Sequence, residues 1–228
     1  MTSEQIKEVV DFYMDDDTQG LLKGMMSQVE VFFENNSILN KEPLPIIHSM
    51  KSRLKNVEHL KDKITRKEEK GIIVTPANLF QEVTDLAGVR ICHLYQDQFR
   101  EIHQQIIKKI EVWGDWAFIE EPKAYTWDPE SQKLYEELGI RTEVRDTYYT
   151  SVHYVVTPNN KSNPSCCEIQ VRTLFEEIWG KIDHTINYPH KTESVACKEQ
   201  LRVLAKLVST GTRLADSIFR SYNDYNMQ

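Results

Sequence analysis

The strict alternation of apolar and polar side chains in CCEIQVRT, residues 166–173, limits the local structure more than any other feature of the chain. Successive side chains of a β-strand point to opposite faces, so this segment predicts a strand with one apolar and one polar face. The polar side chains follow one another at about 7 Å, and they are Glu168, Gln170 and Arg172. This face is either exposed to solvent or the wall of a site.

Helical and strand-like stretches alternate along the rest of the chain. Further strands are expected at 86–95, 116–121, 142–149 and 151–157. Helical periodicity marks 3–14, 21–34, 46–70, 76–83, 99–113, 129–138, 174–188 and 198–221. Asp97 and Asp128 stand where N-caps of the fifth and sixth of these helices are expected. The pattern predicts an α+β fold, with a mixed sheet of about four or five strands that is packed and flanked by helices.

Composition and charge exclude several function classes. No stretch approaches the roughly 20 apolar residues of a membrane helix, and the acidic N-terminal residues lack the layout of a signal peptide. The four cysteines form no C-x-x-C pair, which favours a reducing, cytoplasmic location. The formal net charge of −7 argues against a general affinity for nucleic acid, so any anion site has to be a local basic patch. Phosphate-loop, G-x-G-x-x-G, H-E-x-x-H and G-x-S-x-G motifs are missing.

Cations gather on one side of SRLKNVEHLKDKITRK, residues 52–67. At 100° per residue they cover about a quarter of a helix, opposite an apolar stripe. Such a face is either solvated or able to bind a polyphosphate, which several cations together can neutralise. The cations are Lys55, His59, Lys63 and Arg66, with Arg53 at the start of the stretch.

Two shorter motifs carry side chains suited to chemistry. In VTDLAGVR, Asp85 could hold Mg²⁺ against phosphates, whereas Arg90 lies inside an apolar strand and needs a partner. The two either form a salt bridge or serve one site, and the second case requires that Asp85 precedes the regular strand or that Gly88 marks a bulge. In DTYYTSVHY, Tyr149 comes shortly before His153, which is either a ligand-binding residue or an ordinary histidine of the sheet.

In this order, these motifs resemble the RelA/SpoT synthetase domain, above all the small single-domain alarmone synthetases. The matching strings are SRLK with its basic helix, DLAGVRI, YYTSVHY, EIQVRT and EIWGKIDHTINY. The resemblance implies a nucleotidyltransferase-like mixed sheet over 46–190, with helical flanks at 1–45 and 191–228. It also implies transfer of pyrophosphate from ATP to the 3′-hydroxyl of GDP or GTP, without hydrolase activity.

The resemblance assigns a role to each candidate residue. Asp85 and Glu168 would bind Mg²⁺ as the catalytic carboxylates, and Glu168 would complete the metal site or take the proton of the attacking hydroxyl. Arg53 and Arg90 would sandwich the adenine of ATP. The ATP phosphates would be held by Lys55, Lys63 and Arg66. The acceptor would stack on Tyr149, beside His153 and Gln170.

The acceptor side departs from the family pattern. Tyr148 stands where the family usually has glycine, and Asp146 stands near positions that often carry cations. Two alternatives therefore stay open: a toxic relative that pyrophosphorylates the 3′ end of tRNA or another nucleotide acceptor, and a silent nucleotide-binding domain. The retained Asp85 and Glu168 argue against the silent domain. The apolar residues of 201–219 either pack on their own domain or bind another copy, and the resemblance favours a homo-oligomer, because family members often assemble through terminal helices.

Overall fold

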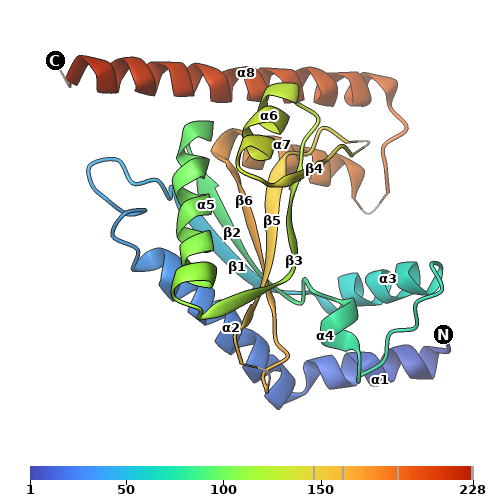
Figure 1. The fold of residues 1–228 in the computed structure, drawn as a ribbon. Helices are drawn as coiled ribbons and strands as arrows, with labels where there is room; N and C mark the ends of the chain where they lie inside the picture. The colour runs from blue at the N-terminus through green and yellow to red at the C-terminus, as the bar shows by residue number, and fades with distance from the viewer. Residues whose placement is uncertain (146, 161, 189, 227–228) are drawn as a thin grey trace.

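A six-stranded mixed β-sheet forms the centre of the computed structural model, which describes residues 1–145, 147–160, 162–188 and 190–226 (Figure 1). The strands lie in the order β1-β2-β6-β5-β3-β4. The β2–β6 and β3–β4 pairs are parallel, and the other three pairs are antiparallel. The strands are β1 (Ser49–Leu54), β2 (Ala87–His93), β3 (Trp116–Tyr125), β4 (Arg141–Glu143), β5 (Ser151–Pro158) and β6 (Cys167–Thr173). The expected fold class is confirmed.

Short polar side chains start several of the helices. The Asp128 carboxylate accepts a hydrogen bond from the Ser131 backbone at the start of α6, and Thr173 and Glu176 form a reciprocal capping box at the start of α7. The helices are α1 (Ser3–Met14), α2 (Asp16–Glu34), α3 (Val57–Glu68), α4 (Leu79–Glu82), α5 (Phe99–Ile107), α6 (Pro129–Glu137), α7 (Leu174–Asn187) and α8 (Val195–Asn226). A 3₁₀ turn (Gln96–Gln98) precedes α5, and a π-helical turn (Lys108–Val112) follows it.

The structure corrects four sequence-based expectations. The stretch 46–70 is divided between β1 and α3, because β1 pairs with β2 and Asn56 caps α3. This extra edge strand raises the number of strands to six. Asp97 does not cap α5, because its carboxylate binds the Arg220 guanidinium at 2.6 Å. The strand expected over 142–149 is confined to β4.

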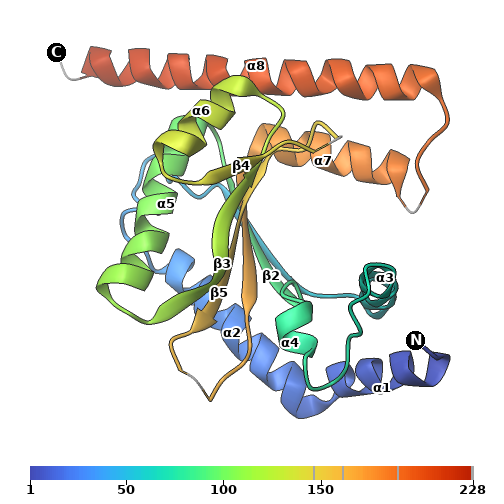
Figure 2. The ribbon, with the colours of Figure 1, turned by 45° about the vertical axis from the view of Figure 1, so that its right-hand side comes forward.

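The apolar face of the sheet packs against helices, so the polar face remains available to form a site. Val89, Ile91, Ile169 and Val171 are buried in a core cluster to which α2 and α5 also contribute. Figure 2 shows α3 and α7 on the side of the sheet opposite α5. In the described part of the chain, no helix is long and apolar enough to cross a bilayer.

Candidate functional site

A cleft of about 1020 Å³ lies over the polar face of the sheet. Its walls come from β1, β2 and β6, from the loop before β5, and from α7 and the segment that follows it. Six of the residues to which the resemblance assigns a role line this cleft: Arg53, Asp85, Arg90, Tyr149, Glu168 and Gln170. The polar face of CCEIQVRT is therefore the wall of a cavity.

Asp85 reaches the same cleft as Arg90 because it precedes the regular strand. β2 begins at Ala87, and its pairing with β1 runs without a shift from Ala87 to Cys92. Gly88 is therefore not a bulge. The strand alternation that would separate the two side chains does not extend back to Asp85.

Two lysines hold the Asp85 carboxylate. Lys55 Nζ lies 2.6 Å from Oδ2, and Lys63 Nζ lies 2.7 Å from Oδ1. Burial alone would raise the pKa of Asp85, but the two ammonium groups outweigh it and lower this pKa to about 2. Asp85 is therefore an ionised carboxylate in a cationic setting.

Arg90, Gln170 and His153 occupy one row across three strands. Gln170 is paired with Arg90 in the parallel β2–β6 ladder and with His153 in the antiparallel β5–β6 ladder. The Arg90 guanidinium donates to Gln170 Oε1 from Nη2 at 3.0 Å and from Nε at 3.2 Å. Arg90 Nη1 also lies 3.4 Å from the buried carboxylate of Glu177.

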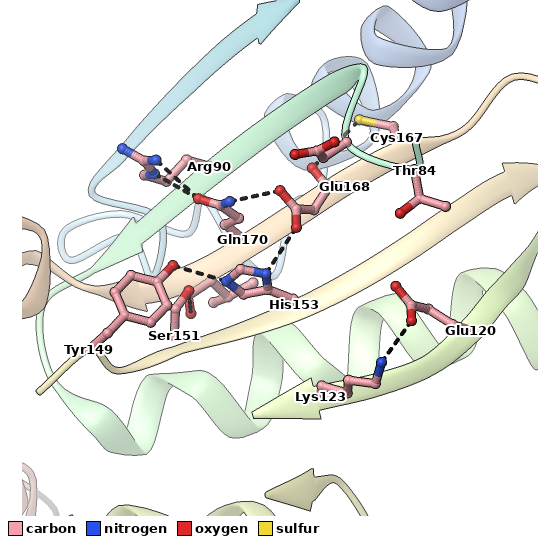
Figure 3. A network of polar contacts seen from close by, with 12 residues as sticks. Thr84, Arg90, Glu120, Lys123, Tyr149, Ser151, His153, Cys167, Glu168 and Gln170 are labelled. Atoms are coloured by element: carbon pink, nitrogen blue, oxygen red, sulfur yellow. Dashed lines mark hydrogen bonds and ion pairs between the residues drawn. The ribbon is translucent and has the colours of Figure 1, made fainter. Parts of the chain in front are cut away.

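Glu168 is bound on both of its oxygens, as Figure 3 shows. Gln170 Nε2 lies 2.7 Å from Oε2, and His153 Nδ1 lies 2.9 Å from Oε1. Burial favours a higher pKa for Glu168, but the hydrogen bonds from His153 and Gln170 help to lower the pKa below its ordinary value. Glu168 is therefore ionised at neutral pH.

Tyr149 is the tyrosine of the YY pair that faces the cleft. Its hydroxyl lies 2.9 Å from His153 Nε2, and the Arg172 guanidinium lies 5.7 Å from the centre of its ring. Tyr148 instead packs edge-on against Trp127, with ring centres 5.2 Å apart, in a separate cluster that includes Trp179. Asp146 lies outside the described residues.

The remaining predicted residues lie at the edge of the site or beyond it. Lys55 and Lys63 bind Asp85, which lines the cleft. His153 contacts Tyr149 and Glu168, which also line it. Arg66 is exposed on α3, where its Nε donates to the Asp62 carbonyl oxygen, and it does not line the cleft.

Sequence reasoning missed several side chains on the α7 side of the cleft. Arg172 is not among them, because strand alternation had already assigned it to the polar face of β6, and it lines the cleft with Glu168 and Gln170. His184 lies in the last turn of α7 and Tyr188 is the C-cap residue four positions later, and their rings stack with centres 4.6 Å apart. That spacing was the available signal. The Tyr188 ring also contacts His59 of α3 edge-on, with ring centres 5.1 Å apart.

The carboxylates suit a metal ion that is shared with substrate. Within the described residues, no group of three or more His, Cys, Asp or Glu side chains could hold a metal ion by itself. Asp85 and Glu168 line one cleft, and Asp85 is close enough to affect the pKa of Glu168. Mg²⁺ is commonly bound by one or two carboxylates together with substrate phosphates, so this donor set fits Mg²⁺.

A family model described as "Region found in RelA / SpoT proteins" matches residues 52–193, which is more than half of the chain. The chain belongs to this family. The matched region contains the basic helix α3, both carboxylates, Tyr149, and all of α7.

Known RelA/SpoT relatives agree in sequence and fold. GTP pyrophosphokinase YwaC of Bacillus subtilis (strain 168) is 29% identical over 145 residues, which are 63% of this chain and 59% of that protein. A GTP pyrophosphokinase family protein from Streptococcus pneumoniae has a TM-score of 0.66 at 21% identity, covering 99% of this chain and 97% of its own. Small alarmone synthetase 1 from Bacillus subtilis has a TM-score of 0.65 at 18% identity, covering 92% and 100%. The synthetase 1 structures include complexes with AMPCPP and with its product pppGpp.

Proposed function

We propose that this protein is a nucleotide pyrophosphokinase that transfers pyrophosphate from ATP to the 3′-hydroxyl of GDP or GTP. The observation that carries the proposal is one cleft that contains two carboxylates, Asp85 and Glu168, with lysines at one end and Tyr149 at the other. A related small alarmone synthetase binds AMPCPP and its product pppGpp, which supports this choice of donor and acceptor.

ATP is placed at the α3 end of the cleft. Arg53 and Arg90 line the cleft from the neighbouring strands β1 and β2. Their guanidinium groups can hold the adenine between them by stacking. Lys55 and Lys63, which bind Asp85 in this structure, bind the phosphates, with Arg66 at the outer end of α3.

The acceptor is placed against Tyr149, beside His153 and Gln170, with its 3′-hydroxyl near Glu168. Glu168 takes the hydroxyl proton or completes the metal site with Asp85. The O3′–Pβ bond forms while the bond from Pβ to the oxygen of the α-phosphate breaks, and AMP leaves with that electron pair. Mg²⁺ bound between the carboxylates and the phosphates would neutralise the negative charge that develops there.

The test follows the transferred group directly. ATP that carries a label on its γ-phosphate is incubated with the protein and Mg²⁺ in separate reactions. Each reaction contains one acceptor: GDP, GTP, unlabelled ATP or tRNA. Label is expected in GDP and GTP. Label in tRNA alone would replace the proposal with the tRNA-modifying alternative, and label in no acceptor would refute pyrophosphate transfer.

We further propose that the protein is a homo-oligomer through α8. Leu201, Ala205 and Val208 face the rest of the molecule, whereas a second apolar stripe on the opposite side of α8 is exposed. At 100° per residue, this outer stripe is about 60° wide. Its residues are Val203, Leu207, Leu214, Ile218 and Tyr225.

A second copy of the chain fits this stripe because antiparallel pairing of two α8 helices about Leu214 brings apolar residues together at the centre and at both ends of the contact. In this register Leu214 meets its own copy, and Val203 lies opposite Tyr225 of the partner subunit. The same register brings Lys206 near Asp224 of the partner subunit, and this charge pair occurs twice.

We also propose a cytoplasmic location. Free thiols at all four cysteines agree with this location.

A further inference from the structure

A chain of hydrogen bonds crosses the floor of the cleft and has Glu168 at its centre (Figure 3). One arm runs from Arg90 through Gln170 to Oε2 of Glu168. The other runs from Tyr149 through His153 to Oε1 of Glu168. The two arms join the residue placed at the donor base to the residue placed at the acceptor base. Which atom donates at each step follows from the chemistry of the side chains.

The Arg90 arm has one possible direction. A guanidinium has only donors, so both Arg90 contacts, at 3.0 and 3.2 Å, must end on an acceptor. The Gln170 oxygen therefore faces Arg90, and its amide nitrogen faces Glu168 at 2.7 Å. Reversing the amide would place donor against donor at Arg90 and acceptor against acceptor at Glu168.

The His153 arm has the same direction. An ionised carboxylate only accepts, so the 2.9 Å contact requires a proton on His153 Nδ1. In neutral imidazole the other nitrogen, Nε2, is then an acceptor. The Tyr149 hydroxyl, 2.9 Å away, therefore donates to it. Both arms deliver donors to Glu168, one on each oxygen.

We propose that His153 and Gln170 are positioning residues that hold the Glu168 carboxylate in a fixed orientation by donating to one lone pair of each oxygen. The remaining lone pairs of Glu168 are then directed into the cleft, toward the acceptor hydroxyl and the phosphates. Outer hydrogen-bond partners of this kind commonly change activity by about 10–100-fold when they are removed. The role in turnover rests on the proposed function, whereas the direction of the hydrogen bonds does not.

The proposed hydrogen-bond direction requires residue 170 to accept from Arg90 and to donate to Glu168. A glutamate there would pair well with Arg90, but its second oxygen would face Glu168, and two carboxylates would repel each other. Methionine has a similar size and supplies neither the donor nor the repulsion. We expect kcat to fall by about 10-fold or more in Gln170→Met and by a further 10-fold or more in Gln170→Glu. Equal activity of the two variants, or a more active Gln170→Glu, would overturn the proposed direction of this arm.

Two substitutions of His153 separate positioning from packing. Asparagine can keep an N–H group near the position of Nδ1, whereas leucine fills the space without a donor. His153→Leu should lower kcat by about 10–100-fold, a larger effect than its change in the KM of the acceptor placed beside it, and His153→Asn should recover part of the loss in kcat. Lys123 pairs with His153 in the β3–β5 ladder but binds Glu120 at 2.8 Å, so Lys123→Met is the matched control. Identical losses in the Leu and Asn variants, or a loss in KM alone, would refute the positioning role.

The tautomer of His153 tests the network without any enzyme assay. Nitrogen-15 NMR of the protein, recorded over a pH series up to the range in which the imidazole signals no longer change, distinguishes a proton on Nδ1 from one on Nε2. The His153 signals are identified by their loss in His153→Asn. A proton on Nδ1 is expected, and a proton on Nε2 would refute the network. If Nδ1 carries the proton while no nucleotide acquires label, the network stands and the proposed function fails.

Discussion

The Lys63 ammonium binds the Asp85 carboxylate, with Nζ 2.7 Å from Oδ1, and so joins α3 to the start of β2. Lys55 binds the other oxygen and is itself almost fully buried. The side chains proposed to hold ATP phosphates therefore neutralise the charge of the proposed metal ligand. Asp85 accordingly contributes to stability as well as to the proposed reaction.

Asp85→Asn should remove nearly all pyrophosphate transfer and also destabilise the fold. The substitution leaves the buried Lys55 without its counter-charge, so we expect a loss of about 1–3 kcal/mol in the free energy of unfolding. Urea denaturation and the labelled-ATP assay measure the two effects. Glu82→Gln is the control, since it breaks a comparable pair with Lys67 away from the cleft. Full activity in Asp85→Asn would contradict the metal assignment.

Arg90→Ala should raise the KM for ATP more than the KM for the acceptor. A cation stacked on an aromatic ring contributes about 0.5–2 kcal/mol, so the expected rise is about 2- to 30-fold. Steady-state kinetics with each substrate varied in turn measures the difference. Arg100→Ala removes an exposed ion pair with Glu137 and serves as the control. Equal rises for both substrates would show that Arg90 acts only through Gln170 and Glu177.

Tyr149→Ala should lower kcat/KM for the acceptor by about 5- to 150-fold, the equivalent of the 1–3 kcal/mol typical of a stacked base. ATP binding measured without acceptor should hardly change, because the donor is proposed to lie at the other end of the cleft. Tyr148→Ala is the matched control, since Tyr148 packs against Trp127 outside the cleft. A larger loss of acceptor use in Tyr148→Ala than in Tyr149→Ala would reverse the assignment.

Glu176 should make the protein less stable as the pH rises from about 4.5 to about 7. Burial at the start of α7 raises the pKa of Glu176 to about 7, above its ordinary value of 4.5. The folded state therefore retains a proton that the unfolded state has released, and this stabilisation is complete below pH 4.5 and lost above pH 7. Glu176→Gln should remove roughly 2–3 kcal/mol of this pH dependence, as measured by urea denaturation at several pH values. The same dependence in Glu176→Gln would exclude this residue as its source, and exposed Glu111→Gln is the control.

Leu214→Glu should separate an α8-mediated oligomer into monomers. The substitution places like charges at the centre of the proposed antiparallel pair, where two copies of Leu214 meet. Light scattering should then change from a multiple of 26.8 kDa to 26.8 kDa itself. Val195→Glu changes an exposed apolar residue of α8 outside the stripe and should leave the mass unchanged. A wild-type protein that is monomeric at micromolar concentration would refute the interface.

The structure shows which sequence signals were sufficient. α1, α6 and α7 begin where caps or helical periodicity predicted a helix to start. β2 and β6 lie inside the predicted alternating segments, and β5 extends one residue beyond its predicted end. β1 was missed because SMKSRL has only two apolar residues and lies at the edge of the sheet. Its strand conformation depends on pairing with β2, which is a tertiary interaction that local periodicity does not record.

The sequence by itself determined which side chains share a face of one strand, because the period of two is a property of the backbone. That is why Glu168 and Gln170 could be assigned to one polar row before any fold was known. Only the tertiary structure decided that β6 lies between β2 and β5, which brings Arg90 and His153 to that row from residues far apart in the chain. Neighbouring strands are selected by the burial of their common apolar face in one core, and this non-local choice leaves no mark on the pattern of any single segment.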